Sequence, residues 1–483
     1  MRDRLPTTAC ATIHEHSLTV LSEIGMAVEH DAAREALDAA GATVDGTAVT
    51  LPPDLVESCL DDAPSSFTWH ARNPGRTVTV GGDTDEQVLT PGTGARHVLS
   101  HQSGRSRATM ADFEKLVRLA HVAEPIDCIG YDLCSPERFA LGGNPGGFED
   151  ADPGYELLET LLTHSDKPLV GSARTAANAR ASIDMASLAV GDETPSKPVV
   201  LGRVHPRSPR RWNEPIVDGL REFAADGQPL IVSSGAIAGA SAPVSLSETV
   251  VLANAETLFG LVLAQVTNAG TPVLFGYAST HYDPDAGAVA YGGPTSSLLS
   301  SIGVRMGQYY DLPARTEGGV TDAKTLGDQS GSESMRKLAG AFDSGADLVF
   351  NAAGLLDTYE TISPAKFVLD CERIRDLQWS AGTHDTLVDS LASDVSLDRI
   401  RDAAPGDAFT DERDPSSVAD APSVQSETAR RGRYTAWEDA GAETAVDRAA
   451  ARVDDLLEVY ERPPVDESVR HTLRDYVDAH ADS

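Results

Sequence analysis

Short apolar runs recur along the central part of the chain, and their regular spacing constrains the fold more than any other feature of the sequence. The runs begin about 30 to 45 residues apart, the pitch of a strand and a helix with their loops. They lie at Ile126 to Gly130, Pro168 to Gly171, Pro198 to Leu201, Pro229 to Ser233, Pro272 to Gly276, Pro313 to Gly318 and Asp347 to Ala352. Buried strands that alternate with helices form a parallel sheet. These seven units predict an α/β fold, a closed TIM (β/α)8 barrel rather than a doubly wound sheet.

A barrel of this type needs an eighth strand, which the spacing does not reveal. It lies near Phe367 to Leu369 or comes from elsewhere in the chain. The helices between the strands are easier to find. The clearest is Ser245 to Val266, where Ser245 and Glu248 form a capping box before a long apolar stretch.

The residues before and after these units predict the domain organisation. Residues 1–125 read as an N-terminal α+β cap, with a helix opened by Pro53 and strands at Thr77 to Val80 and Gln87 to Leu89. Residues 126–403 form the TIM-barrel catalytic domain.

The C-terminal part of the chain divides into two segments. Residues 404–430 are rich in Asp, Pro, Ser and Ala and indicate an acidic linker or surface loop. Residues 431–483 form a helical extension, with helices expected around Ala442 to Tyr460 and Asp466 to Ala479.

The charge balance excludes one class of function and suggests an environment. Asp and Glu number 74 against 39 Lys and Arg, a net charge of −35, and this charge repels the phosphates of nucleic acids. Lysine is scarce among the basic residues. A carboxylate-rich surface with little lysine is typical of a halophilic protein, because concentrated salt screens the repulsion between carboxylates. GC-rich codon usage would explain the ratio of Arg to Lys but not the acid excess.

Cysteine usage and hydropathy predict a cytoplasmic protein. The five cysteines are an odd, scattered set without a CxxC pair, which argues against a disulfide framework or a zinc site. No run of about 20 apolar residues appears, so we expect neither a membrane span nor a membrane partner. The N-terminus shows no signal peptide pattern.

Several segments of the chain resemble the trimethylamine methyltransferase family. These are SSGAIAGASAPVSL, GYASTHYDPDAGAVAYGGP, GGVTDAKTLGDQSGSE and NAAGLLDTYETISPAKFVLDCE, with HEHSLTVLSEIG, PGTGARHVLSHQSGRSRATMADFEKLVRLA and YTAWEDAG outside the barrel. The resemblance covers nearly the whole chain. It implies a TIM-barrel enzyme that passes a methyl group from a methylated amine to the cobalt of cobalamin, a corrinoid carried by a separate protein, with no metal of its own.

One departure from the family pattern predicts the type of substrate. The trimethylamine enzymes carry pyrrolysine, whereas this chain has only the twenty standard residues. Members without pyrrolysine resemble glycine betaine methyltransferases. Chemistry supports this division, because a quaternary ammonium leaves as a neutral tertiary amine when Co(I) attacks its methyl carbon. We therefore expect a small quaternary amine, glycine betaine or similar, as the substrate.

Aromatic and acidic side chains follow the apparent ends of the strands, where barrel active sites form. A quaternary cation is bound by aromatic faces and carboxylates rather than by hydrogen bonds. Glu317 is the carboxylate candidate. The aromatic candidates, some of which would instead only pack the barrel mouth, are Phe275, Tyr277, Tyr282 and Tyr291.

Further polar residues of the same loops are candidates for the site. Lys324 either neutralises a nearby acid such as Asp322 or binds a substrate carboxylate, and we expect both residues among the catalytic ones. Residues expected to contact substrate are His281, Gln329 and Asn351. A nearby acid, Glu333, is expected to cap a helix with Ser330 instead.

Two alternative functions remain open at this stage. The first is a TIM-barrel lyase or hydrolase that uses Glu317 and Lys324 as acid and base, and the second is a non-catalytic amine-binding protein. A corrinoid protein is the expected partner, and the chain is a possible homo-oligomer.

Overall fold

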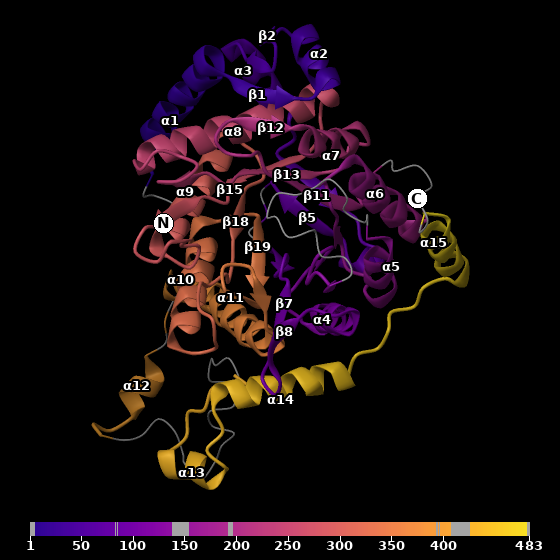
Figure 1. The fold of residues 1–483 in the computed structure, drawn as a ribbon. Helices are drawn as coiled ribbons and strands as arrows, with labels where there is room; N and C mark the ends of the chain where they lie inside the picture. Colours follow the sequence, from indigo (N-terminus) through magenta and orange to yellow (C-terminus); the bar gives the residue numbers. More distant parts are fainter. Residues whose placement is uncertain are drawn as a thin grey trace.

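Parallel strands form a central barrel in the computed structural model, which describes residues 5–82, 84, 86–137, 154–191, 197–392, 395, 397–406 and 426–480. Within these residues eight strands make up the barrel (Figure 1): β6 (Val88–Pro91), β9 (Ile129–Gly130), β10 (Leu169–Val170), β11 (Val200–Val204), β13 (Leu230–Ser234), β15 (Val273–Tyr277), β18 (Arg315–Glu317) and β19 (Leu348–Ala353).

Hydrogen bonds join these strands into a ring. One parallel sheet runs in the order β15-β13-β11-β10-β9 and a second in the order β18-β19-β6. A parallel bridge between Phe275 and Ala314 joins β15 to β18. The Asp127 N–H donates to the Leu89 carbonyl at 3.0 Å and joins β6 to β9. The predicted TIM barrel is confirmed.

The eighth strand is β6, which lies among the residues expected in the N-terminal cap. It pairs in parallel with β19, so that Val88 lies opposite Leu348 and Leu89 lies opposite Val349. Residues 367–369, the alternative place for this strand, lie instead in a helix. All four residues of β6 are buried, as is typical of a strand covered on both faces. A run of four residues is too short to show a periodicity, so the sequence pattern did not identify β6 as a barrel strand. The wider division into domains at residues 125, 403 and 430 stays a prediction.

A helix follows each barrel strand and covers its outer face (Figure 1). These helices are α4 (Met110–Val122), α5 (Tyr155–His164), α6 (Ala176–Val190), α7 (Glu214–Ala225), α8 (Leu246–Thr267), α9 (Pro294–Tyr309), α10 (Asp328–Ser344) and α11 (Pro364–Ala392). The Ser245 side chain accepts from the Glu248 N–H at the start of α8, as one half of the predicted capping box requires. Among the described helices, α8 has the length and hydropathy of a membrane span, and most of it is buried in the protein, as in a core helix.

The inside of the barrel is apolar at the amino ends of the strands. Phe67, Trp69 and Val80 close this end; they belong to the hairpin of β4 (Ser66–Trp69) and β5 (Val78–Gly81). Between β4 and β5 lies the short helix η2 (Pro74–Arg76). The apolar residues of the barrel strands that pack against this hairpin are Val88, Cys128, Val170, Leu201, Ile231, Leu274 and Leu348. Any site for polar chemistry inside the barrel therefore lies toward the carboxyl ends.

The N-terminal elements lie over α8, in indigo in Figure 1. They are α1 (Thr7–Thr19), η1 (Val20–Ile24), β1 (Met26–Glu29), α2 (Asp31–Ala39), β2 (Thr43–Asp45), β3 (Ala48–Thr50) and α3 (Pro53–Asp62). Strand β1 pairs with β3 and also with β12 (Arg211–Asn213), which follows the barrel strand β11. The N-terminal part is thus joined to the barrel through a shared sheet.

Short strands in the loops after the barrel strands build the rim of the barrel mouth. These are β7 (His97–Ser100), β8 (Gly104–Arg107), β14 (Ile237–Ala238), β16 (Thr280–Asp283), β17 (Ala288–Val289), β20 (Leu355–Leu356) and β21 (Thr361–Ile362). The loop after β6 folds as the β7–β8 hairpin, and β7 pairs with β21 from the loop after β19.

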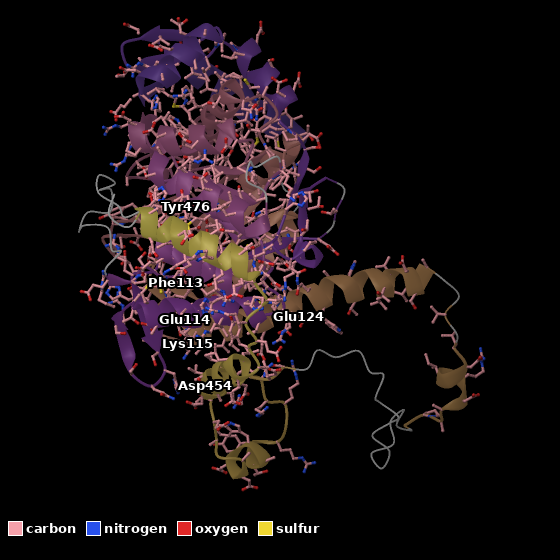
Figure 2. The ribbon with its side chains drawn as sticks, turned by 90° about the vertical axis from the view of Figure 1, so that its right-hand side faces the viewer. Phe113, Glu114, Lys115, Glu124, Asp454 and Tyr476 are labelled. Atoms are coloured by element: carbon pink, nitrogen blue, oxygen red, sulfur yellow. The ribbon has the colours of Figure 1, made fainter. Side chains whose placement is uncertain are left out.

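The C-terminal part packs on the outside of the barrel. Its helices are α12 (Asp398–Asp402), α13 (Tyr434–Asp439), α14 (Ala445–Glu458) and α15 (Glu467–His480). Helix α14 contacts α4 and α11, and α15 contacts α5 and α6. Figure 2 shows Asp454 of α14 below α4 and Tyr476 of α15 on the barrel wall. The two predicted helices are present, and residues 407–425 of the predicted linker lie outside the described residues.

Candidate functional site

Side chains that point into the barrel change from apolar to charged toward the carboxyl ends of the strands. Alternate residues of a strand face the same way. On β11, Arg203 therefore follows Leu201 on the inner face, and His205 follows Arg203. On β18 the inward residues are Arg315 and Glu317, both almost completely buried. The barrel mouth holds a buried cluster of ionic side chains.

Glu317 lies in the middle of this cluster and is 4% exposed. Its carboxylate forms an ion pair with the Arg315 guanidinium, and the Asn351 Nδ2 donates to its Oε2 at 3.1 Å. Burial acts to raise the pKa of Glu317, but Arg315 and Lys337 outweigh burial, so that the pKa lies below its ordinary value. The carboxylate is therefore charged at neutral pH.

Asn351 holds Glu317 from the neighbouring strand β19. Its φ of 56° is in the left-handed region, which non-glycine residues rarely adopt. The side-chain Oδ1 accepts from the Thr93 N–H at 2.9 Å and from the Thr93 hydroxyl at 3.0 Å, which leaves Nδ2 to donate to Glu317. A strained backbone held by its surroundings is typical of functional sites.

Two tyrosines form an aromatic wall beside Glu317. The rings of Tyr291 and Tyr359 meet edge to face with their centroids 4.9 Å apart. The Tyr359 hydroxyl donates to Glu317, and burial together with Glu317 raises the pKa of this hydroxyl well above its ordinary range. The buried Lys337 ammonium donates to the Tyr291 carbonyl at 3.0 Å. A carboxylate beside two aromatic rings is a suitable environment for a quaternary cation.

A cationic group of side chains lies in the same mouth, on β11 and on the loops after β9 and β10. Arg174 pairs with Asp132 at 2.7 Å, while Arg203 lies 3.9 Å from the same carboxylate and donates to the Thr93 hydroxyl at 3.3 Å. Arg203 also lies over the Phe350 ring, 4.9 Å from its centroid. In the described part of the chain two guanidinium groups thus share one carboxylate, so this group carries net positive charge.

His205 completes this group as a neutral side chain. Burial lowers the pKa of His205 to about 4, and Arg203 adds to the effect. The His205 Nδ1 lies 2.7 Å from the Ser233 carbonyl oxygen, which can only accept, so Nδ1 carries the proton and Nε2 is an acceptor.

The structure does not bring Phe275 and Tyr277 to the mouth. Both rings lie between β15 and the outer helices, and the Tyr277 hydroxyl donates to Asn254 of α8 at 2.7 Å. The inward positions of β15 are Leu274 and Gly276, because successive side chains alternate. A Cβ at Gly276 would collide with the Arg315 carbonyl oxygen and with the methylene groups of its side chain, so the glycine makes room for Arg315. The prediction that Phe275 and Tyr277 line the mouth was based on their nearness in the sequence and did not consider which face of the strand each side chain lies on.

Lys324 lies outside the cluster, on the surface of the loop after β18. Its side chain is 68% exposed and pairs with Asp357 at 2.6 Å. Asp322 connects the loop after β15 with the loop after β19, because its carboxylate accepts from the Gly292 N–H at 2.7 Å and from the Thr358 hydroxyl at 2.9 Å. Gln329 is exposed on α10 and donates to Glu333. These three residues do not touch Glu317.

His281 and Tyr282 lie on β16 at the rim. His281 is half-buried beside Gly293, and Tyr282 is 38% exposed. Of the residues predicted for the site, the structure thus places Glu317, Tyr291 and Asn351 together in the mouth, with His281 and Tyr282 farther out.

Glu333 is not the helix cap that the sequence suggested. Helix α10 begins at Asp328, so Ser330 and Glu333 both lie inside it, and the Glu333 carboxylate accepts from the Thr321 hydroxyl and the Asp322 N–H. It therefore fixes the loop that follows Glu317.

Four residues of the cluster were not predicted from the sequence: Tyr359, Arg203, Arg174 and Arg315. Arg315 stands on the inner face of a predicted strand, so alternation within that strand would have found it. Arg203 lies two residues beyond the predicted strand at Pro198 to Leu201, because β11 extends to Val204. Tyr359 follows β20 in a left-handed turn, with φ of 54°, 54° and 72° at residues 357 to 359, and no local residue pattern predicts this turn. Among the described residues no group of three or more His, Cys, Asp or Glu is arranged to hold a metal ion.

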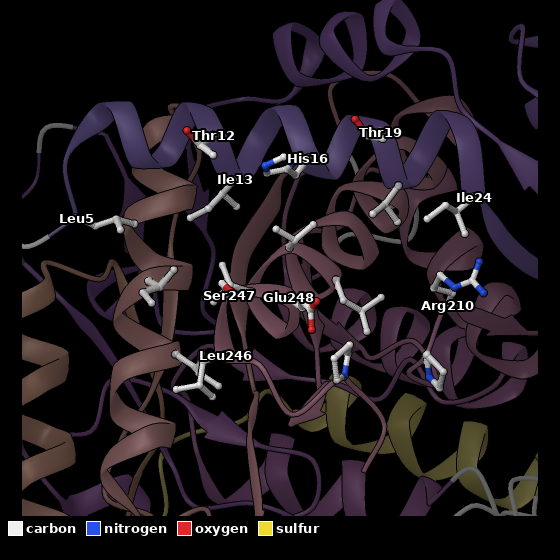
Figure 3. A pocket seen from close by; sticks show the side chains of 18 of the residues that line it. Leu5, Thr12, Ile13, His16, Thr19, Ile24, Arg210, Leu246, Ser247 and Glu248 are labelled. Atoms are coloured by element: carbon white, nitrogen blue, oxygen red, sulfur yellow. The ribbon is translucent and has the colours of Figure 1, made fainter. Parts of the chain in front are cut away.

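A large surface groove lies at some distance from this cluster, between α1 and the first turns of α8 and α9 (Figure 3). Its volume is about 940 Å³, and its lining is mostly apolar, with Ile13, Leu246 and Leu298 among the residues that form it. Glu317 and the arginines of the mouth do not line it, so it adds nothing to the chemistry of the site.

Comparison with known proteins places the chain in one family. The family model described as trimethylamine methyltransferase matches residues 2–483. The glycine betaine methyltransferase of Desulfitobacterium hafniense (strain Y51) is 31% identical over 96% of this chain and 94% of its own length. The proline betaine:corrinoid methyltransferase of Eubacterium limosum is 29% identical over 74% of each chain.

Relatives of lower sequence identity also match most of the chain. The trimethylamine methyltransferase MttB of Methanosarcina barkeri (strain Fusaro / DSM 804) is 27% identical over 98% of this chain and 94% of its own. Among solved structures, the hydroxylamine MtmB complex aligns with a TM-score of 0.52 at 10% identity, over 94% of this chain and 88% of that one, and shows a shared fold. The chain belongs to the trimethylamine methyltransferase family.

Proposed function

We propose that this chain transfers a methyl group from a quaternary amine to the Co(I) of a corrinoid, a cobalamin carried by a separate protein. The observation that carries the proposal is the buried, charged Glu317 beside the rings of Tyr291 and Tyr359, at the mouth of a barrel whose relatives are betaine methyltransferases. Such a site attracts a trimethylammonium group by charge and by cation–π contact without requiring a hydrogen bond.

The reaction needs little from the protein beyond binding and orientation. Two electrons of Co(I) form the new cobalt–carbon bond, and the electron pair of the broken carbon–nitrogen bond stays on nitrogen. The amine leaves neutral, so no general acid is needed. This suits a mouth in which Glu317 stays ionised and Lys324 points to solvent in a pair with Asp357. The same exposure of Lys324 disfavours a lyase or hydrolase that relies on Glu317 and Lys324 together.

The cationic group in the mouth favours a betaine over a simple quaternary cation. A betaine carries a carboxylate in addition to its ammonium group. Arg203 is the best-placed residue to bind this carboxylate, because its contact with Asp132 is long and its hydrogen bond goes to a neutral hydroxyl. Lys324, for which carboxylate binding was one of two expected roles, lies outside the cluster and pairs with Asp357.

The direct test is spectroscopic. The protein is mixed with free Co(I) cobalamin and glycine betaine, proline betaine, choline or trimethylamine, and the appearance of methyl-Co(III) is followed. We expect methylation with one or more betaines and none with trimethylamine. A protein that binds betaine but leaves Co(I) unchanged with the whole panel would be a non-catalytic amine-binding protein instead.

A substitution at Arg203 tests the carboxylate assignment. In Arg203→Met we expect the KM for the betaine substrate to rise at least about tenfold, because one charge-assisted hydrogen bond to the substrate is lost. The rate with choline, which has no carboxylate, should change little. An equal loss with both substrates would assign Arg203 to the scaffold rather than to substrate.

Cytoplasmic location is part of the proposal. All five cysteines are free thiols in the structure, which suits the reducing conditions that Co(I) chemistry needs. Assembly into a homo-oligomer stays a prediction.

A further inference from the structure

Lys337 is a buried lysine at the barrel mouth to which the proposed reaction gives no role. It belongs to α10 and is 2% exposed. Its ammonium donates to the Tyr291 carbonyl at 3.0 Å and to the Ser296 hydroxyl at 3.0 Å, and both acceptors are neutral. Within the described residues no carboxylate lies within ion-pair distance of this ammonium, whereas the buried Lys366 of α11 pairs with Asp370. A buried cation without a direct counter-charge is unfavourable, and such groups occur at functional sites.

Glu317 is the strongest opposite charge that faces Lys337, but its carboxylate is already shared. It forms its ion pair with Arg315, whose guanidinium acts against the charge of Lys337. Asp322 acts on Lys337 more weakly and accepts its hydrogen bonds from other groups, while Arg336 on α10 opposes it. Two buried cations thus depend on the carboxylate of Glu317, and a quaternary ammonium bound beside it would be a third.

The other neighbours of α10 leave Lys337 without a carboxylate of its own. Helix α9 contributes the Ser296 hydroxyl, and its charged residue, Arg305, bonds to the N-terminal segment. On α11 the carboxylate of Asp370 is bound by Lys366. Glu333, one turn before Lys337 in α10, accepts its hydrogen bonds from the loop after β18.

Lys337 can lose its proton without losing its contacts. Burial lowers the pKa of Lys337 to about 8, although Glu317 acts in the opposite direction. An uncharged amine keeps two N–H groups, which are enough for the Tyr291 carbonyl and the Ser296 hydroxyl. A substrate cation beside Glu317 repels the ammonium, and this repulsion is strong where water is excluded. Loss of the proton relieves the repulsion and keeps both hydrogen bonds.

We propose that a quaternary ammonium that binds beside Glu317 drives the release of a proton from Lys337 to solvent; this inference rests on the proposed function. Lys337 thereby determines how tightly the mouth binds a cation, because its ammonium competes with the substrate for the charge of Glu317. The neutral amine still holds the Tyr291 carbonyl. Binding should strengthen as the pH rises toward about 8 and level off above it, since a site that releases a proton binds more tightly when protons are scarce.

Proton release is measured by calorimetric titration of the unmodified enzyme with glycine betaine, at pH 7.5 in two buffers of different ionisation enthalpy. We expect about half a proton or more to be released for each betaine bound, which corresponds to a proton held at least about tenfold more weakly in the complex. The dissociation constant should fall at least about fivefold from about pH 6 to about pH 8. Binding without proton release, or with a dissociation constant that does not change with pH, would overturn the inference.

Replacement of the ammonium tests whether Lys337 is the source of the proton. In Lys337→Met we expect no proton release and a dissociation constant that changes less than about twofold over the same pH range. Lys324→Met is the matched control, because it also removes one positive charge, but from an exposed side chain that pairs with Asp357. It should keep the proton release and the pH dependence of the unmodified enzyme.

The outcomes separate this inference from the proposed function. Proton release that persists in Lys337→Met, or that is lost equally in Lys324→Met, contradicts the role of Lys337. If Lys337→Met does not fold, Lys337→Gln takes its place, because an amide keeps donors for the buried acceptors without a charge. An enzyme that methylates free Co(I) cobalamin from betaine but releases no proton on binding overturns the inference alone. If no betaine methylates free Co(I) cobalamin, the proposed function itself is wrong.

Discussion

Glu317 and Lys324 lie seven positions apart in the sequence, yet the structure gives them opposite environments. Glu317 ends β18 on its inner face and is buried beside Arg315, whereas Lys324 lies in the loop beyond and is open to solvent. A buried ion pair depends on both partners, while a surface pair contributes little. The two residues therefore make a matched comparison for substitution.

We predict that Glu317→Gln lowers the rate of methyl transfer from betaine at least about tenfold, because the amide keeps the shape but loses the charge that faces the cation. Lys324→Ala should stay within a factor of about two, as its ion pair is exposed. Both rates are measured with free Co(I) cobalamin and corrected for the folded fraction, since Arg315 is left unpaired in the Gln variant. A Gln variant that is fully active would remove Glu317 from the site.

At the scale of elements, the start of α11 ties together the loops that carry the site. Lys366 donates to the Gly319 carbonyl at 2.8 Å and the Ser334 hydroxyl at 2.9 Å, and it forms an ion pair with Asp370. Asp370 also accepts from the Gly354 N–H at 2.9 Å. One buried pair thus holds the loop after β18 and the loop after β19 against each other, behind Glu317 and Asn351.

We predict that Asp370→Asn lowers the free energy of unfolding by about 3 to 5 kcal/mol, because it leaves the Lys366 ammonium buried without a counter-charge. The double variant Lys366→Met/Asp370→Leu should lose less, since it removes both charges. Urea unfolding of the three proteins gives the comparison. A single variant as stable as the unmodified chain would show that water, rather than Asp370, solvates Lys366.

At the scale of the whole molecule, repulsion among carboxylates opposes folding at low ionic strength. We predict that the thermal midpoint rises from low to molar salt, because screening weakens this repulsion. Melts in a series of NaCl and KCl concentrations test this. A flat or falling midpoint would contradict the expectation, drawn from the sequence, that the surface is halophilic.

Buried histidines predict how stability depends on pH. Burial lowers the pKa of both His121 and His205 to about 4, against about 6.5 in an unfolded chain. Between these values the unfolded chain holds more protons, so the protein loses stability as the pH falls from about 6.5 to about 4, by at most about 3 kcal/mol for each residue. Urea midpoints across this range should fall, and His121→Gln should reduce the slope. An equal slope in the variant would assign the effect to other groups.

Much of the architecture follows from local sequence patterns. The pitch of the apolar runs determined the barrel, and Ser245 marked the start of α8. The family motifs identified the loops that line the mouth, and among their residues Glu317, Tyr291 and Asn351 do lie together. The predictions of the barrel and of the start of α8 succeeded because strand burial and helix capping depend on residues that are close in the sequence. The role of the three site residues in binding substrate stays a prediction.

Only the tertiary structure decided which side chains meet. The ring closes when β6 pairs with β19, residues about 260 positions apart, and no local pattern encodes such a pairing. Inward or outward direction on β15 depends on a one-residue register, which separates Tyr277 from Glu317 although both end a barrel strand. Arg203 points into the mouth from β11 because of its register, whereas Tyr359 reaches the mouth through the left-handed turn after β20. The sequence by itself determined the elements and the kind of chemistry, whereas closure of the barrel determined the site, because the packing of distant strands sets the position of each side chain.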